Sequence, residues 1–251
     1  MCSPLEKKIP LKEIIAKNDE LFNAGSSFEI GEHLRFWLSK AQEFGDKQGE
    51  LSLWNELMGH YRMTNDRPRG MEAVRRGMEL IEELGIAETF SAGTIFLNGA
   101  TALQSFGETD AALELYEKCR TVYNAQLPLN DRCFAGLYNN MAAALAAKGA
   151  FKEAENAYLQ ALDLLKEGGA IPDSAVTCLN LAQLYRQWNG DEAMIETMVA
   201  CAVEYFNAPE CPRDGYYAHS CTKCASGFEA LGYGEIAREL LSRAGEYYER
   251  T

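Results

Sequence analysis

A cysteine-rich stretch near the carboxyl end of the chain contains residue types that bind metal ions. Cys211, His219, Cys221 and Cys224 include a C-x-x-C pair with a histidine two residues before it. Zinc in proteins is held tetrahedrally by thiolate sulfur and imidazole nitrogen, often from closely spaced residues of this kind. A zinc site is therefore one interpretation of this stretch. The other is that the thiols are packing residues.

Two further patterns with chemical potential are weaker. Residues 232–237 match G-x-G-x-x-A, but a dinucleotide-binding turn requires a preceding strand, and the residues before this match have a helical pattern. His33, His60 and His219 are scattered, with no nucleophile or carboxylate at an informative spacing. We therefore expect a protein that is not an enzyme and that has no cofactor.

Charge and hydropathy exclude several classes of partner. The net charge of the 251 residues is −13, whereas nucleic-acid binding depends on Lys and Arg that neutralise phosphates. No stretch approaches the roughly eighteen apolar residues of a membrane span, and the start lacks the apolar segment of a signal peptide. We expect a cytoplasmic protein that binds neither nucleic acid nor membrane.

A repeat of 42 residues organises the chain. Trp54, Phe96 and Tyr138 recur at this interval, which is typical of one supersecondary unit stacked on copies of itself. In the third copy, residues 137–145 and 152–162 have helical apolar spacing, and Gly149 lies between them. Because glycine adopts the positive φ that ends a helix, this pattern predicts two helices per unit.

The pattern resembles the tetratricopeptide repeat, in the long form of the kinesin-light-chain-like and bacterial peptide-sensing branch. This family has a large residue at positions 4 and 24, small residues at 8, 20 and 27, and a glycine near 15. The third copy carries Tyr138, Ala142, Gly149, Ala154, Tyr158 and Ala161 at these positions, and the second carries Phe96, Ala100, Gly107, Ala112, Tyr116 and Cys119. Weaker copies have Trp54, Cys178 and Cys221 at position 4.

The resemblance implies an all-α fold, a right-handed superhelical solenoid of antiparallel helix pairs. It predicts five repeats in one continuous solenoid, at about 49–91, 92–131, 132–172, 173–215 and 216–251. Residues 1–48 are expected to form a degenerate helical pair that caps the array, with a packing stripe of Leu34, Leu38, Ala41 and Phe44. Residues 247–250 are expected to close the last repeat.

The repeat also accounts for most of the cysteines. Cys221 and Cys224 fall at repeat positions 4 and 7, and Cys119 and Cys201 at position 27. This register favours reduced thiols that serve as small core residues, with the zinc site as the alternative.

In this family the first helix of each repeat lines a concave groove. The groove residues that the resemblance implies are Asn55, Arg62, Asn98, Thr101, Gln104, Asn139, Asn140, Asn180, Gln183, Arg186 and Lys223. Asn98, Asn140 and Asn180 share position 6, where asparagines of related proteins contact peptide backbone. A carboxamide offers both an acceptor and donors, as a peptide group does. The alternative is that these asparagines bond the adjacent helix and hold the repeats in register.

These observations predict a non-enzymatic module that holds an extended or short helical peptide of a partner protein in its groove. Arg62, Arg186 and Lys223 are expected to meet acidic side chains or a terminal carboxylate. The alternative function is a scaffold that self-associates as a homo-oligomer, through its outer helices or through terminal residues such as Tyr247 and Tyr248.

Overall fold

The computed structural model describes residues 7–23 and 26–249, and this part of the chain contains twelve helices and no strand. The predicted all-α helical-repeat fold is confirmed. The chain divides into two compact units, residues 1–127 and 128–251. Continuity of the two as one solenoid stays a prediction.

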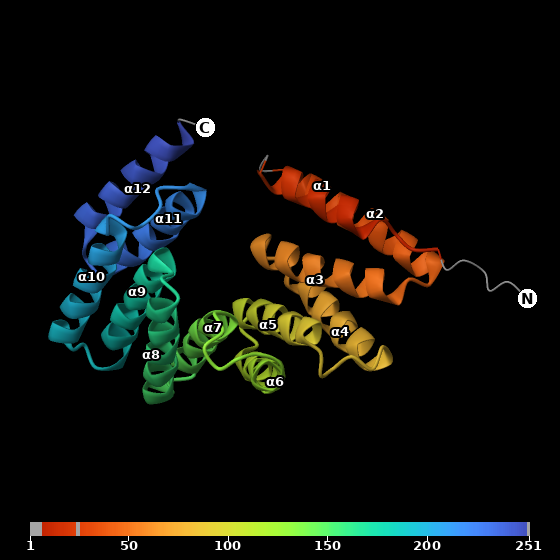
Figure 1. Ribbon diagram of the computed structural model, residues 1–251, viewed down its shortest axis with the longest axis horizontal. Helices are drawn as coiled ribbons and strands as arrows, with labels where there is room; N and C mark the ends of the chain where they lie inside the picture. Colours follow the sequence, from red (N-terminus) through yellow and green to blue (C-terminus); the bar gives the residue numbers. More distant parts are fainter. Residues whose placement is uncertain (1–6, 24–25, 250–251) are drawn as a thin grey trace, which may run out of the picture. The chain divides into compact units, whose positions relative to one another are not determined.

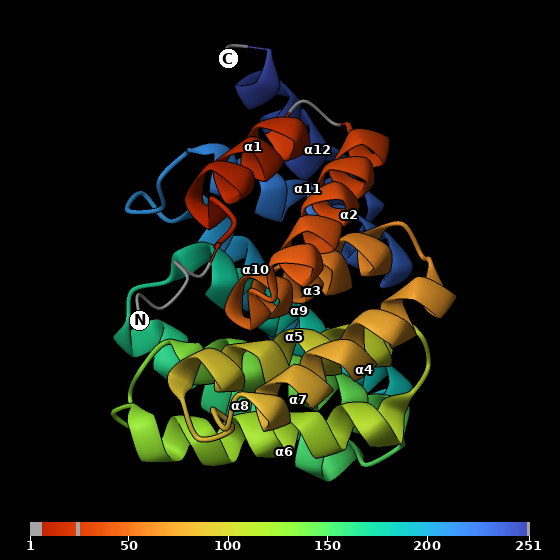
Figure 2. The ribbon, with the colours of Figure 1, turned by 90° about the vertical axis from the view of Figure 1, so that its right-hand side faces the viewer.

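The first unit contains six helices. They are α1 (Leu11–Asn23), α2 (Ser27–Phe44), α3 (Lys47–Met63), α4 (Arg67–Glu83), α5 (Phe90–Ser105) and α6 (Thr109–Gln126). Within this unit each helix packs against the next along the chain, and α3 also packs against α5 (Figure 1). The first helices of the second and third pairs, α3 and α5, therefore lie side by side (Figure 2).

The second unit is also built from helix pairs. Its helices are α7 (Cys133–Ala147), α8 (Phe151–Glu167), α9 (Ile171–Trp188), α10 (Glu192–Asn207), α11 (Gly215–Ala230) and α12 (Gly234–Tyr248). Helices α7 and α8, α9 and α10, and α11 and α12 form pairs, and α9 contacts both α7 and α11 (Figure 1). Helix α9 is thus flanked on both sides by equivalent first helices.

The turn between the two helices of each full repeat contains one residue with left-handed backbone. Asn65, Gly107, Gly149, Gly190 and Gly232 have φ between 53° and 93°, at intervals of 42, 42, 41 and 42 residues. Glycine adopts this conformation without a steric penalty, and asparagine tolerates it better than most residues. In the fourth repeat Gly190 takes this role, and Asn189, the residue at repeat position 15, does not.

Two helices begin slightly earlier than the predicted repeats, because an aspartate caps each of them at its amino end. Helix α3 begins at Lys47, two residues before the predicted start, because the carboxylate of Asp46 accepts a hydrogen bond from the Gly49 amide at 3.0 Å. Asp214 caps α11 in the same way, through the Tyr217 amide at 2.9 Å. Each cap satisfies an amide that has no partner within its helix.

Small side chains hold the helices of each pair close together. Ala142, Ala154 and Ala161 are fully buried, as are Ala100, Ala112 and Cys119 in the preceding repeat. The stripe predicted in α2 is confirmed at Leu34, Leu38 and Ala41, whereas Phe44 is half-buried beneath the amino group of Lys7.

Two other expectations concern the ends of the chain and the membrane. Of the closing residues 247–250, Tyr247 and Tyr248 pack edge to face at the end of α12, and Arg250 lies outside the described residues. Nowhere in the described helices are length and apolar character sufficient to cross a membrane.

Candidate functional site: a carboxamide-lined cleft in the second unit

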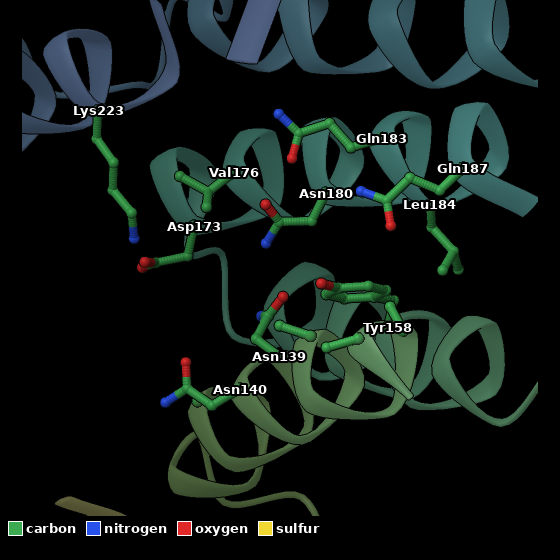
Figure 3. Close-up of a pocket in the computed structure, with 14 residues that line it drawn as sticks. Asn139, Asn140, Tyr158, Asp173, Val176, Asn180, Gln183, Leu184, Gln187 and Lys223 are labelled. Carbon is green, nitrogen blue, oxygen red and sulfur yellow. The ribbon is translucent and has the colours of Figure 1, made fainter. Parts of the chain in front are cut away.

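A cleft of about 440 Å³ opens between α7, α9 and α11. It brings together five of the predicted groove residues, which are Asn139, Asn140, Asn180, Gln183 and Lys223. Val176, Gln187, Asp173 and the buried Tyr158 complete most of its wall (Figure 3). The lining is therefore rich in side-chain amides, with one cationic and one anionic group.

Helix α9 supplies three carboxamides along one face. Asn180, Gln183 and Gln187 are separated by three and four residues, so successive turns of the helix place them side by side. All three line the cleft, and Figure 3 shows the Gln183 amide directed toward α11, where it lies close to Gly227. None of the three forms a side-chain hydrogen bond within the part of the chain that the structure describes. Their donors and acceptors are thus available to a ligand.

The opposite wall, from α7, has a different role. The Asn139 side chain donates hydrogen bonds to Thr177 Oγ1 at 2.9 Å and to the Ala135 carbonyl at 3.2 Å. Thr177 belongs to α9 and is fully buried. Asn139 therefore ties α7 to α9, which is the register-holding role that the sequence left open.

Lys223 and Asp173 place opposite charges on the cleft. Lys223 extends from α11, is exposed, and forms no ion pair among the described residues (Figure 3). Asp173, in the first turn of α9, accepts a hydrogen bond from the Tyr216 hydroxyl. Burial and this carboxylate raise the pKa of Tyr216, so the phenol stays protonated at physiological pH. The carboxylate is held in place by this hydrogen bond, while the ammonium group has no ion-pair partner among the described residues.

In the first unit, the corresponding asparagines satisfy each other. Asn98 Nδ2, on α5, donates to Asn55 Oδ1, on α3, at 2.9 Å. This bond uses one donor and one acceptor of the pair that the resemblance assigned to peptide binding. Here too the asparagines hold neighbouring first helices in register.

The other predicted residues of the first unit gather around Tyr116. Its hydroxyl donates to Gln104 Oε1 at 2.7 Å, and Thr101 Oγ1 donates to the Leu97 carbonyl at 2.9 Å. Burial raises the pKa of Tyr116 to about 12, although the Thr101 hydroxyl and the charge of Arg62 act in the opposite direction. Arg62 is exposed at the end of α3.

Arg186 does not line the cleft. It is exposed, and its guanidinium forms an ion pair with Glu192 at 3.0 Å across the turn between α9 and α10. The repeat position of Arg186 predicted that it lies in the groove. Its ion pair with Glu192, six residues later, instead holds the side chain at the end of α9.

The structure offers no donor set for the alternative zinc site. Cys211, Cys221 and Cys224 are buried, whereas His219 is exposed. No group of three or more His, Cys, Asp or Glu in the described residues is arranged to hold a metal ion. Burial raises the pKa of all three thiols, that of Cys224 to about 12, which disfavours the thiolate that zinc requires.

Sequence reasoning missed Gln187, Asp173 and Tyr158. Gln187 is at repeat position 13, which the family places on the groove, so the repeat register was sufficient to find it. Asp173 lies two residues before position 1 of the fourth repeat, so it has no groove position, and Tyr158 reaches the cleft from the second helix of the preceding repeat. No signal in the first-helix positions indicated either residue.

Residues 134–167, which span most of α7 and α8, match the tetratricopeptide repeat family. No curated protein matches the sequence. Solved structures match over much greater lengths. The chain has the fold of tetratricopeptide-repeat proteins.

Three solved structures illustrate this similarity. The nearly identical TPR-like repeats of a kinesin-light-chain-like protein from Podosopora anserina superpose with a TM-score of 0.57 at 18% identity, covering 80% of this chain and 95% of that one. BtubC (BKLC) from P. vanneervenii has a TM-score of 0.52 at 17% identity, covering 97% and 92%. The apo form of RapI has a TM-score of 0.66 at 10% identity, covering 98% and 86%.

The resemblance read from the sequence is thereby confirmed, because tetratricopeptide repeats are found both in the sequence comparison and among the structural matches. Such repeats are protein-interaction modules, which fits a cleft lined by amides. At these identities the structural likeness shows the fold alone.

Proposed function

We propose that the second unit is a non-enzymatic module that binds a peptide segment of a partner protein in the carboxamide-lined cleft. The observation that carries this proposal is the row of Asn180, Gln183 and Gln187, whose amides have no hydrogen-bond partner among the described residues. A peptide backbone offers one donor and one acceptor per residue, which matches these groups. The cleft volume of about 440 Å³ is within the range of protein pockets that bind ligands.

The charges indicate how such a segment is oriented. Lys223 is available to a carboxylate of the peptide, either an acidic side chain or the chain terminus. Because each net hydrogen bond contributes only about 0.5–1.5 kcal/mol, the amides alone give weak binding. The charged groups and the apolar Val176 and Leu184 must supply the specificity.

The test is to select ligands from a random peptide library displayed on phage and to compare variants. Peptides selected on the wild-type chain should bind an Asn180→Ala/Gln183→Ala variant at least about tenfold more weakly, because two hydrogen bonds are lost. The matched control is Asn55→Ala/Asn98→Ala, which removes similar amides that are paired in the first unit. Affinities are measured by fluorescence anisotropy, and folding by circular dichroism.

This control separates the two roles of the amides. The Asn55→Ala/Asn98→Ala variant should keep its peptide affinity and lose thermal stability. Undiminished binding by Asn180→Ala/Gln183→Ala would remove the cleft as the binding site, as would failure to select any peptide.

Self-association is the alternative function, and exposed aromatic rings favour it. Phe28 and Phe36 on α2 are 78% and 54% exposed, and Tyr248 at the end of α12 is 55% exposed. Burial of such rings against a second copy of the chain would remove apolar surface from water, which favours association. The signature of this function is a mass, measured by light scattering, that falls on dilution.

A further inference from the structure

A second groove, of different chemistry, lies in the first unit. It has a volume of about 430 Å³ and runs between α4 and α6, with α5 beneath it. We call it the α4–α6 groove. Its floor is apolar and includes Ile81, Phe96 and Val122, which come from α4, α5 and α6 respectively. Phe96 is two residues from Asn98, about 200° around the helix, so the groove is on the side of α5 away from the paired asparagines.

The rim of this groove is acidic. Glu82, Glu88 and Glu114 line it from α4, the following loop and α6, and all three side chains are exposed. None of the three forms an ion pair within the described residues. Neighbouring acidic residues differ, because Glu79 pairs with Arg75 and Arg76, and Glu117 with Arg120. The three rim carboxylates thus remain unneutralised around an apolar floor.

Among the described residues that line the groove, Lys118 is the only cation, and it covers the floor. Its amino group is 5.9 Å from the centroid of the Phe96 ring, within the range of a cation–π contact. The residue is exposed on α6, so the contact is held only by a flexible side chain. A cation already placed over the ring indicates that this floor accepts a positively charged group from outside.

We propose that the α4–α6 groove docks a cationic amphipathic helix of a partner protein. The apolar stripe of that helix would lie on Ile81, Phe96 and Val122, and flanking Lys or Arg side chains would meet Glu82, Glu88 and Glu114. The walls are helices with no unpaired backbone edge, so a strand has nothing to pair with, whereas a third helix fits between two others. This surface is distinct from the peptide cleft in residues and in charge.

Charge argues that the occupant is another protein. None of the twelve described helices carries a net positive charge, and the whole chain has a net charge of −13. A second copy would therefore bring carboxylates to an acidic rim, which costs free energy. A partner helix rich in Lys and Arg removes this repulsion.

The probe is a synthetic helical peptide of leucine and lysine, with all leucines on one face. Its control has the same composition with the leucines dispersed around the helix. We expect the first peptide to bind the full chain and the second to bind at least about fivefold more weakly, because only the first presents an apolar stripe. Binding is measured by isothermal titration calorimetry at low salt.

Three variants test the residues. Glu82→Gln/Glu114→Gln should weaken binding about fivefold, since two exposed charge pairs are lost. The matched control Glu153→Gln/Glu196→Gln removes two exposed glutamates of α8 and α10 that have no ion pair among the described residues, and should change affinity less than about twofold. Lys118→Ala should strengthen binding, because it uncovers Phe96 and removes a competing cation.

Several outcomes would overturn the proposal. If both pairs of Glu→Gln substitutions weaken binding equally, the peptide binds through the net charge of the protein and not at this groove. If the peptide with dispersed leucines binds equally well, the apolar floor does not contribute to binding. Weaker binding to Lys118→Ala would place the peptide elsewhere. A dimer that dissociates on Glu82→Gln/Glu114→Gln substitution would make a second copy the occupant. Circular dichroism confirms that each surface variant is folded.

Discussion

Asparagines at one repeat position have different roles because their hydrogen-bond partners differ. Asn98 and Asn180 occupy the same repeat position, yet Asn98 donates to Asn55 at 2.9 Å, while Asn180 opens onto the cleft. In both repeats the preceding first helix carries an asparagine at position 5, Asn55 or Asn139. Asn139 is bonded to Thr177 of α9, whereas α5 has no hydroxyl at that position, so Asn55 accepts from Asn98. A repeat position therefore fixes the direction of a side chain but leaves its function to the residue opposite.

The fold places the carboxyl group of Glu56 in surroundings that disfavour its ionised form. It has position 6 of the first full repeat, where the next three repeats have asparagine, and it accepts a hydrogen bond from Asn18 Nδ2 at 3.2 Å. Burial, and then the charge of Asp19, raise the pKa of Glu56. Beside it, Asn18 Oδ1 is buried and has no hydrogen-bond partner among the described residues. Protonation of Glu56 would supply the missing donor.

The prediction concerns the pH dependence of stability. Because the folded state binds the Glu56 proton more tightly than the unfolded chain does, Glu56 favours folding most below its unfolded pKa, and this contribution is lost as pH rises through the raised pKa. Glu56→Gln should therefore raise the free energy of unfolding at pH 7 by about 1 kcal/mol, with a smaller gain at pH 4. Urea unfolding at the two pH values measures this change.

The control for Glu56 is Glu13→Gln, an exposed glutamate on α1. It should change the free energy of unfolding by less than about 0.5 kcal/mol at either pH. A gain for Glu56→Gln that is equal at pH 4 and pH 7 would show that its ionisation does not matter.

At the residue scale, the sequence predicted which side chains face the cleft, but not which residues those side chains contact. The repeat register placed Asn139, Asn140, Asn180, Gln183 and Lys223 on the wall of one cleft. It could not show that Arg186 pairs with Glu192, or that Asn139 bonds Thr177. These contacts depend on rotamers and on residues up to 38 positions away, which no local pattern encodes.

At the scale of helices, glycines explain the weak match of the repeat that begins near Trp54. Met58 occupies position 8, where the family has a small residue, and it is fully buried. Gly77, at position 27, makes room for it, because a Cβ there would overlap the Met58 methyl group. Gly70, at position 20, makes room for the ring of Phe106 in the same way. Large and small residues have exchanged places while the helices remain close.

Substitutions at the two glycines should therefore differ. Gly70→Ala meets a rigid ring, so we expect a loss of about 1–3 kcal/mol in the free energy of unfolding, although alanine favours a helix by about 1 kcal/mol. Gly77→Ala meets the end of a flexible side chain, so its effect should be within about 1 kcal/mol of neutral. Chemical denaturation of both variants provides the measurement.

A double-variant cycle identifies the cause. Phe106→Leu should recover part of the stability that Gly70→Ala loses, because the smaller side chain leaves space for the new methyl group. If the two losses simply add, the ring is not what the glycine accommodates.

The arrangement of the elements was largely readable from the sequence. Buried small residues and left-handed turns recur with the repeat, so Gly107 and Gly149 were placed by spacing alone. The fourth repeat differs, because Gly190 turns the chain one residue later than Asn189 would. A glycine next to an asparagine gives two candidates for the turn, and the backbone uses the one with no Cβ.

For the molecule as a whole, the net charge of −13 makes stability dependent on salt. Most ion pairs join residues three or four apart on one helix, with nitrogen–oxygen distances of 4 Å or less. Repulsion among the excess carboxylates acts over longer distances, beyond the screening length of about 10 Å at 0.1 M salt. Salt therefore weakens the repulsion more than it weakens the pairs.

We expect added sodium chloride to raise the melting temperature by roughly 2–4 °C, which corresponds to about 1 kcal/mol in a chain of this size. Scanning calorimetry from low to moderate salt measures the shift. An uncharged osmolyte at equal osmolality serves as the control. A falling melting temperature would mean that the local ion pairs outweigh the repulsion.

The buried thiols have a consequence for the time course of motion within the repeats. Cys178 and Cys224 are free thiols that are buried in the fourth and fifth repeats. Burial raises the pKa of Cys178 and of Cys224 to about 12, so the folded chain presents almost no thiolate at these sites. A thiol reagent can modify them only when the surrounding helices separate. The rate at which a reagent labels each of these cysteines therefore reports how often its own repeat opens.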